Sequence, residues 1–87
     1  MQNKRTENDI EKLKVILNVV MQYKLSGHVN DEIVKRLALS VKSLKYLRNE
    51  EYGPRIDKTF SLLIQNKLDE AIKEMRDIIL SFYGGHD

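Results

Sequence analysis

The chain of 87 residues contains no cysteine, no tryptophan and only one proline. Without cysteine, disulfide bonds and thiolate metal sites are excluded. No apolar run approaches the roughly 20 residues that a membrane-spanning helix needs. The first residues, MQNKRTENDIEK, also lack the apolar core of a signal peptide. We therefore expect a cytoplasmic protein with no membrane partner.

The residues that catalysis and metal binding usually require are also scarce. The only two histidines, His28 and His86, have no carboxylates at metal-ligand spacing. The four glycines are too few and wrongly placed for a phosphate-binding loop. Glu50 and Glu51 are neighbours that point apart on a helix, and no nucleophile stands beside a base. We expect no enzyme, no cofactor and no metal site.

What the sequence does contain is helical periodicity. Glycine and proline are rare, and no segment alternates between apolar and polar residues over a long stretch. This pattern predicts an all-α protein, a compact domain of four or five helices over residues 1–87. A chain this short buries only about 60–65% of its unfolded surface, so association with a second subunit is a plausible source of stability.

The first helix is expected over residues 8–27, after a disordered N-terminus at residues 1–7. Asn8 can cap it, and Glu11 completes a capping-box-like pattern. Gly27 is a natural stop. The apolar positions form one stripe, broad enough to pack on two sides: Ile10, Leu13, Ile16, Leu17, Val19, Val20 and Tyr23.

The segment 55–83 is expected to be one long helix or a helical hairpin, followed by a frayed tail at residues 84–87. We favour a break at Asn66 and Lys67. Apolar residues recur at heptad-like spacing along the segment, which is typical of a dimer surface. The predicted homodimer interface consists of Leu68, Met75, Ile78 and Phe82. The alternative is that the segment completes the core of one molecule.

Residues 30–52 carry the most informative pattern, that of a helix-turn-helix. Asn30 precedes one short helix, and Ser40 is a good cap for a second. Leu39 would fill the angle between the helices, and the apolar residues would form a shared core: Ile33, Val34, Leu37, Ala38, Leu44 and Leu47. Gly53 and Pro54 would end the unit.

The stretch DEIVKRLALSVKSLKYL resembles the recognition unit of LuxR-type response regulators and the related fourth region of bacterial sigma factors. The matching positions are Glu32, Ile33, Leu37, Ser40, Ser43 and Leu44. Val34 and Ala38 stand where those families prefer alanine and glycine. The resemblance covers about twenty of the 87 residues. It implies the motif, with its second helix in the major groove of DNA.

The charges point to the same segment. From Lys35 to Lys58 there are seven basic and three acidic residues, whereas from Lys67 onward three basic residues face five acidic ones. A basic middle indicates a polyanionic partner. The predicted contacts with double-stranded DNA are Ser40, Val41, Lys42, Lys45, Tyr46 and Asn49, with Arg48, Lys35 and Arg55 on the DNA backbone.

The function expected from this pattern is sequence-specific DNA binding in transcription regulation, by a dimer on two half-sites. The alternative is a helical adaptor or inhibitor, of a kind that phages also encode, which binds a protein instead. A weaker third hypothesis is an accessory factor for nucleic-acid processing. An exposed basic patch of Lys42, Lys45 and Tyr46 would favour DNA. Internal pairing of these basic residues with Glu50, Glu51 or Asp57 would favour the adaptor.

Overall fold

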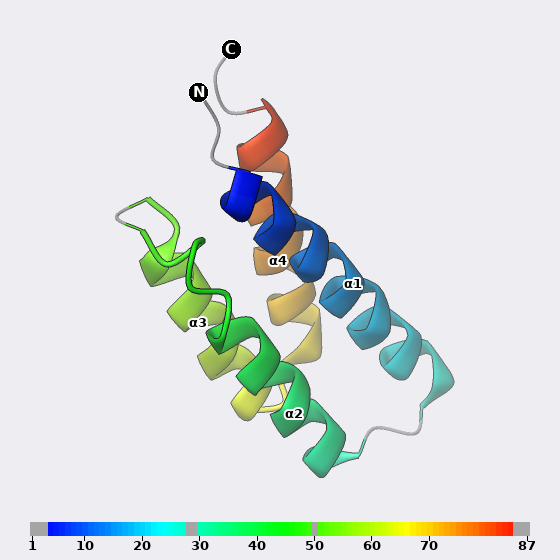
Figure 1. The fold of residues 1–87 in the computed structure, drawn as a ribbon. Helices are drawn as coiled ribbons and strands as arrows, with labels where there is room; N and C mark the ends of the chain where they lie inside the picture. The colour runs from blue at the N-terminus through cyan, green and yellow to red at the C-terminus, as the bar shows by residue number, and fades with distance from the viewer. Residues whose placement is uncertain (1–3, 28–29, 50, 85–87) are drawn as a thin grey trace.

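The computed structural model describes residues 4–27, 30–49 and 51–84. Four helices make up most of this part of the chain, and it contains no strand (Figure 1). They are α1 (Lys4–Ser26), α2 (Asp31–Lys42), α3 (Gly53–Ile64) and α4 (Leu68–Gly84). The predicted all-α fold with four helices is confirmed. The predictions for His28, Glu50, His86 and residues 1–3 and 85–87 lie outside the described residues.

Consecutive helices run antiparallel, and the helices contact one another in the cyclic order α1, α2, α3, α4 and back to α1. Figure 1 shows the start of α1 and the end of α4 at the same end of the bundle. Two contacts between α1 and α4 mark this alignment: the Tyr83 hydroxyl donates to Glu11 near one end, and Lys24 pairs with Asp69 near the other. The arrangement is that of an up-and-down four-helix bundle.

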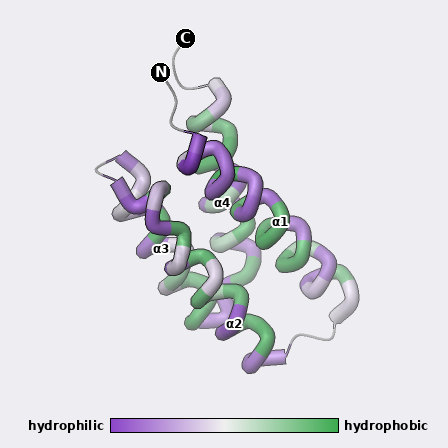
Figure 2. Tube along the Cα trace, in the orientation of Figure 1, coloured by the Kyte–Doolittle hydropathy of each residue, from purple (hydrophilic) through white to green (hydrophobic). Residues whose placement is uncertain are grey.

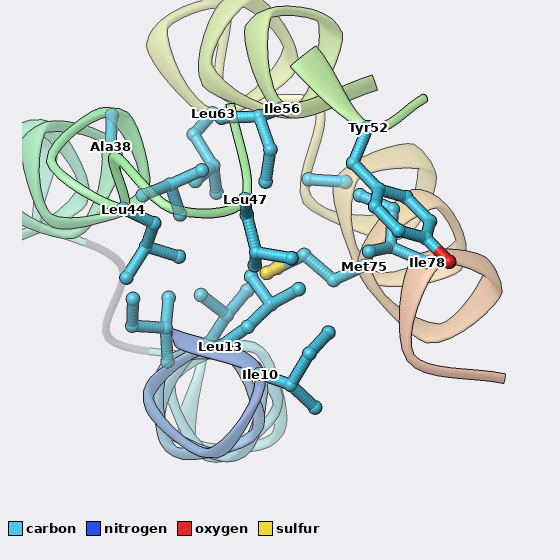
Figure 3. Packing of buried hydrophobic residues seen from close by; sticks show 14 of the residues in the cluster. Ile10, Leu13, Ala38, Leu44, Leu47, Tyr52, Ile56, Leu63, Met75 and Ile78 are labelled. Atoms are coloured by element: carbon cyan, nitrogen blue, oxygen red, sulfur yellow. The ribbon is translucent and has the colours of Figure 1, made fainter. Parts of the chain in front are cut away.

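The core runs along the bundle axis and takes side chains from every helix. Figure 2 shows apolar segments recurring along the helices, and Figure 3 shows the side chains that they point inward. Leu47 lies in the middle of this group, between Leu13 of α1 and Met75 of α4. All three are buried, as are Ile56 and Ile78. Burial of these side chains is the main term that stabilises the fold.

The first helix begins earlier than predicted, at Lys4. The predicted disorder is therefore wrong for residues 4–7, which form its first turn. Asn8 is an exposed residue inside α1 and not its cap, and Glu11 contacts Lys14 and Tyr83 instead of closing a capping box. The helix ends where expected, because Gly27 takes the left-handed conformation (φ +73°) that terminates helices.

The C-terminal segment is two helices, and the break lies at the predicted place. Gln65 to Lys67 separate α3 from α4, and Asn66 has a φ of +60°. Asparagine tolerates this left-handed conformation better than most residues. Gly53 and Pro54 begin α3, where the missing N–H of proline leaves no helical hydrogen bond unmade. Gly84 still belongs to α4, so the predicted tail is one residue too long.

The predicted dimer interface is wrong. Leu68, Met75, Ile78 and Phe82 are all buried within the single chain, where they form the inner face of α4. The same spacing serves a seam between two molecules and a seam inside one bundle, because both need one apolar stripe on a helix. In this fold α1 and α3 cover the stripe, so it is not available to a second copy.

Candidate functional site

The start of α2 agrees with the sequence analysis. Asn30 caps the helix, because its Oδ1 accepts hydrogen bonds from the backbone N–H groups of Glu32 (2.8 Å) and Ile33 (3.4 Å). Val34 and Ala38 are buried, as the predicted small core required. The predicted start of this helix after Asn30 is therefore confirmed.

No second helix begins at Ser40, so that prediction is wrong. Instead, α2 continues through Ser40 and ends at Lys42. Ser40 does not cap; its hydroxyl donates back to the carbonyl of Arg36 (3.0 Å), a bond that serine makes inside helices. Leu39 consequently lies on the outer face of α2 and not in an interhelical angle, with 59% of its surface exposed. A serine between two amphipathic stretches is compatible with a helix boundary and equally with a helix that continues through it.

Residues 43–49 form a series of tight turns where the recognition helix was expected. The buried carboxylate of Asp9 on α1 stabilises these turns, because it accepts hydrogen bonds from the N–H groups of Tyr46 (2.8 Å) and Leu47 (3.2 Å). Leu44 and Leu47 are nevertheless buried as predicted. Their three-residue spacing suits successive tight turns as well as a helix.

Asp9 was missed in the sequence analysis. Its partners are 37 and 38 residues away, so no local pattern points to them. The only available signal is its position one turn before Leu13, on the buried stripe of α1. A carboxylate on such a stripe needs hydrogen-bond donors, because burial without them is costly.

Two of the predicted DNA contacts, Val41 and Asn49, interact within the protein instead. Val41 is fully buried, so its predicted contact with DNA is wrong. Asn49 uses its side-chain oxygen to accept from the N–H groups of Glu51 (3.0 Å) and Tyr52 (2.8 Å), just before α3. These bonds order the connection between α2 and α3 and occupy the amide oxygen of Asn49.

Basic residues of the predicted DNA surface are also partly engaged. Arg48 forms an ion pair with Asp57 (2.8 Å), and Arg55 forms one with Glu74 (3.3 Å). The Lys42 ammonium lies 4.8 Å from the centre of the Phe60 ring.

The Arg5 guanidinium lies 5.4 Å from the ring centre of Tyr46, a cation–π arrangement. Seven of the nine predicted residues are exposed: Lys35, Ser40, Lys42, Lys45, Tyr46, Arg48 and Asn49. Val41 is buried and Arg55 is half-buried, so these two are not part of an open basic surface.

The structure brings a different set of residues together, between α1 and the end of α2. A hollow of about 360 Å³ lies there, which we call the α1–α2 groove. Its lining consists of Lys12, Val15, Ile16, Ser40, Ser43 and Leu44. Of the four pairs of neighbouring helices, α1 and α2 have the least extensive contact. The two helices therefore leave apolar surface between them uncovered.

Apolar side chains also stand at the edges of this groove. Val15 is 64% exposed on the α1 side. Leu39 is adjacent to Ser40 on α2 and one turn before Ser43. Large apolar residues exposed beside an apolar hollow mark interaction sites more often than single scattered ones do. Val15 was also missed in the sequence analysis; its signal was an apolar residue outside the predicted stripe.

The charge around the groove has one sign. Residues 12–27 and 33–49 contain three and five basic residues respectively, and neither segment contains an acidic one. Lys12 lines the groove, Arg36 is one turn before Ser40, and Lys45 follows Ser43 by two residues. All three are exposed, and none forms an ion pair with another described residue.

The carboxylate of Glu11, which is next to Lys12 in the chain, does not neutralise this charge. It is directed toward α4, where it accepts from the Tyr83 hydroxyl (2.7 Å) and from Lys14 (3.0 Å). The hydrogen bond from Tyr83, and then that from Lys14, lower the pKa of Glu11. The groove therefore keeps its uncompensated basic rim.

None of the described helices combines the length and apolar character needed to cross a bilayer. Among the same residues, no three histidine, aspartate or glutamate side chains gather as metal ligands. Comparison with models of known protein families, with curated proteins and with solved structures gives no match for this chain.

Proposed function

We propose that this protein is a helical interaction module that binds a partner protein in the α1–α2 groove. The observation that carries the proposal is the groove itself. Val15 lines the hollow together with the buried Ile16 and Leu44 and is itself exposed, and Leu39, next to the lining residue Ser40, is exposed as well. Covering such surface with a partner's apolar side chains is favourable by roughly 25 cal/mol per Å² removed from water.

DNA binding is the rival function, and the geometry supports it less well. Residues 43–49 do not form the helix that would enter the major groove. Protein–DNA interfaces are strongly polar and positively charged, whereas the lining of the α1–α2 groove is mainly apolar. What supports the rival is the exposed basic residues, which would attract phosphates without reading sequence.

Site-specific photo-crosslinking in cells that express the full chain tests the proposal. A photoreactive phenylalanine derivative replaces Leu39 beside the groove, or Leu80 on the outer face of α4. The two leucines are similarly exposed, at 59% and 62%, so Leu80 is the matched control. We expect one discrete protein adduct from position 39 and none from position 80. Equal adducts from both positions, or none from position 39, would contradict the proposal.

Titration with labelled duplex DNA from about 50 to 200 mM salt tests the rival. Under our proposal binding is weak, falls steeply with salt and shows no preferred sequence. The variant with Lys42→Ala and Lys45→Ala should then lose affinity equally for all duplexes. Tight binding to one sequence that survives at the higher salt, and is lost in this variant, would favour a DNA-binding protein instead.

A further inference from the structure

We infer that the segment of the partner that occupies the α1–α2 groove is an amphipathic α-helix flanked by acidic residues. This inference rests on the proposed function and specifies its ligand. Three features of the groove support it. The floor is apolar, the serine hydroxyls of its wall already donate hydrogen bonds within the chain, and the charged residues near it are basic.

The polar groups of the groove favour a helix over an extended segment. The Ser40 hydroxyl already donates to the Arg36 carbonyl, and the Ser43 hydroxyl donates to the Ser40 carbonyl (2.7 Å). The walls are helices whose backbone groups bond within their own turns. An extended peptide would bury its N–H and C=O groups here without partners, at a large cost. A helix satisfies these groups internally and presents only side chains.

The shape of the groove favours the same occupant. It lies between two antiparallel helices and has an apolar floor of Ile16 and Leu44 with Val15 on one wall. A third helix laid along such a groove inserts residues at i, i+3, i+4 and i+7, the usual mode of helix-in-groove recognition. Val15, which is outside the predicted apolar stripe of α1, is the exposed apolar residue that a partner helix would cover.

The charges specify what flanks the apolar residues of that helix. Lys12 lines the groove, Arg36 and Lys45 are near its lining residues in the chain, and residues 12–27 and 33–49 contain no carboxylate. Acidic residues on the partner would gain attraction from all three, whereas basic residues would be repelled. Electrostatic complementarity of this kind raises the association rate and excludes like-charged competitors.

A second copy of this chain is a poor occupant. The apolar stripe of α4 lies inside the bundle, as the burial of Met75 and Ile78 shows. Glu74 on this helix already pairs with Arg55 and Lys58. Among the described helices, this acidic helix therefore does not offer its apolar stripe to another copy.

A displayed library of helical peptides provides the test. Each peptide has apolar residues at i, i+3, i+4 and i+7, and all other positions are random. The library is selected on the folded full chain, and the enriched peptides are measured against three variants that keep the wild-type circular dichroism spectrum. These are Val15→Gln with Leu39→Gln, Lys12→Glu with Arg36→Glu, and Leu80→Gln as the matched control.

We expect enriched peptides with an excess of Asp and Glu beside the apolar positions. Their affinity should fall about tenfold or more in the groove variant and remain unchanged in the Leu80→Gln control. It should also fall in the charge-reversed variant and be restored when the acidic residues of the peptide are changed to lysine. That restoration would not follow from a merely structural effect of the substitutions.

Other outcomes would contradict the inference, and the crosslinking result shows whether the proposed function fails with it. Enriched peptides without an acidic excess would refute the charge assignment. Failure to enrich any peptide whose binding needs Val15 and Leu39 would refute the helical occupant. If crosslinking from position 39 still captures a protein in either case, the module function stands and only its ligand is wrong. If crosslinking fails as well, both proposals fall.

Discussion

The two hairpins of the bundle, α1–α2 and α3–α4, use similar amphipathic helices but close to different degrees. The α3–α4 hairpin has a three-residue connection, and Glu74 joins its helices by ion pairs with Arg55 (3.3 Å) and Lys58 (3.7 Å). The α1–α2 hairpin has the less extensive contact and leaves the α1–α2 groove open. The difference shows which hairpin closes more fully and which one leaves apolar surface uncovered, the surface on which our proposal depends.

The hairpins also differ in charge. Acidic residues interleave with basic ones along α3 and α4, and several are paired. Residues 12–27 and 33–49, which include every residue that lines the α1–α2 groove, carry basic but no acidic residues. Like charges weaken a helix contact modestly at a solvated surface, so leaving them unpaired costs little stability. Under our proposal, the same charges attract the acidic residues of a partner.

The largest expected effect comes from placing a charge inside the closed hairpin. Ile78→Asp puts a carboxylate at a fully buried position of α4. Burying an unpaired charge costs several kcal/mol, comparable with the roughly 5–15 kcal/mol that stabilises a small protein. We expect loss of the cooperative thermal transition followed by circular dichroism. Leu80→Asp, two residues along on the exposed face, should fold normally.

If Ile78→Asp instead yielded a folded monomer from a wild-type dimer, the burial of this seam within one molecule would be contradicted. Size-exclusion chromatography of both proteins distinguishes this outcome from unfolding. Such a result would also reverse the comparison, because α4 would then carry the interaction surface.

The second largest effect is expected from the hydrogen bonds that join α1 to the turns that follow α2. Asp9→Ala removes the acceptor for the N–H groups of Tyr46 and Leu47 and should lower the free energy of unfolding by about 1–3 kcal/mol. Urea denaturation measures this loss, and amide exchange at the two residues should accelerate. Asp9→Asn keeps an acceptor oxygen and should lose less. Equal losses would show that charge, and not hydrogen bonding, stabilises the turns.

A smaller effect is expected from the ion pairs that join α3 to α4. Glu74→Gln removes both pairs around a carboxylate that is largely covered, and should cost up to about 1 kcal/mol. The loss should shrink near 1 M salt, where screening is strong.

Asp69→Asn removes the more exposed pair with Lys24 and should change stability by less than about 0.5 kcal/mol. A larger loss in Asp69→Asn would reverse the ranking of the two contacts.

For the smallest expected effect, the informative quantity is the sign of the change in stability. Ser40 is inside α2, so Ser40→Ala should stabilise the protein by a few tenths of a kcal/mol, because alanine is the better helix former. If Ser40 capped a second helix, the same change would cost about 1 kcal/mol. Asn30→Ala, at the cap seen in the structure, should show that cost. Thermal melts of both variants decide between the two readings.

Much of the fold was predictable because it depends on local chemistry. Gly27 ends α1, Asn30 caps α2 and the break at Asn66 separates α3 from α4, and each follows from the backbone preferences of one residue. The burial of Leu44 and Leu47 was also predictable, since apolar spacing reports which side of the chain faces inward. That Lys12, Val15 and Ile16 meet Ser40, Ser43 and Leu44 in one groove was not predicted, because the two segments are about 28 residues apart in the chain.

The sequence by itself determined that this protein is helical, where three of its helix ends lie and that Leu13, Leu44 and Leu47 are inside. These outcomes depend on propensity, capping and periodicity, which act over a few residues. Only the tertiary structure decided that residues 43–49 are turns and that the α4 seam faces inward. Both depend on contacts made at a distance along the chain. The carboxylate of Asp9 reaches Tyr46 and Leu47 only after α1 has packed beside α2, and the seam of α4 faces inward only because α1 and α3 cover it.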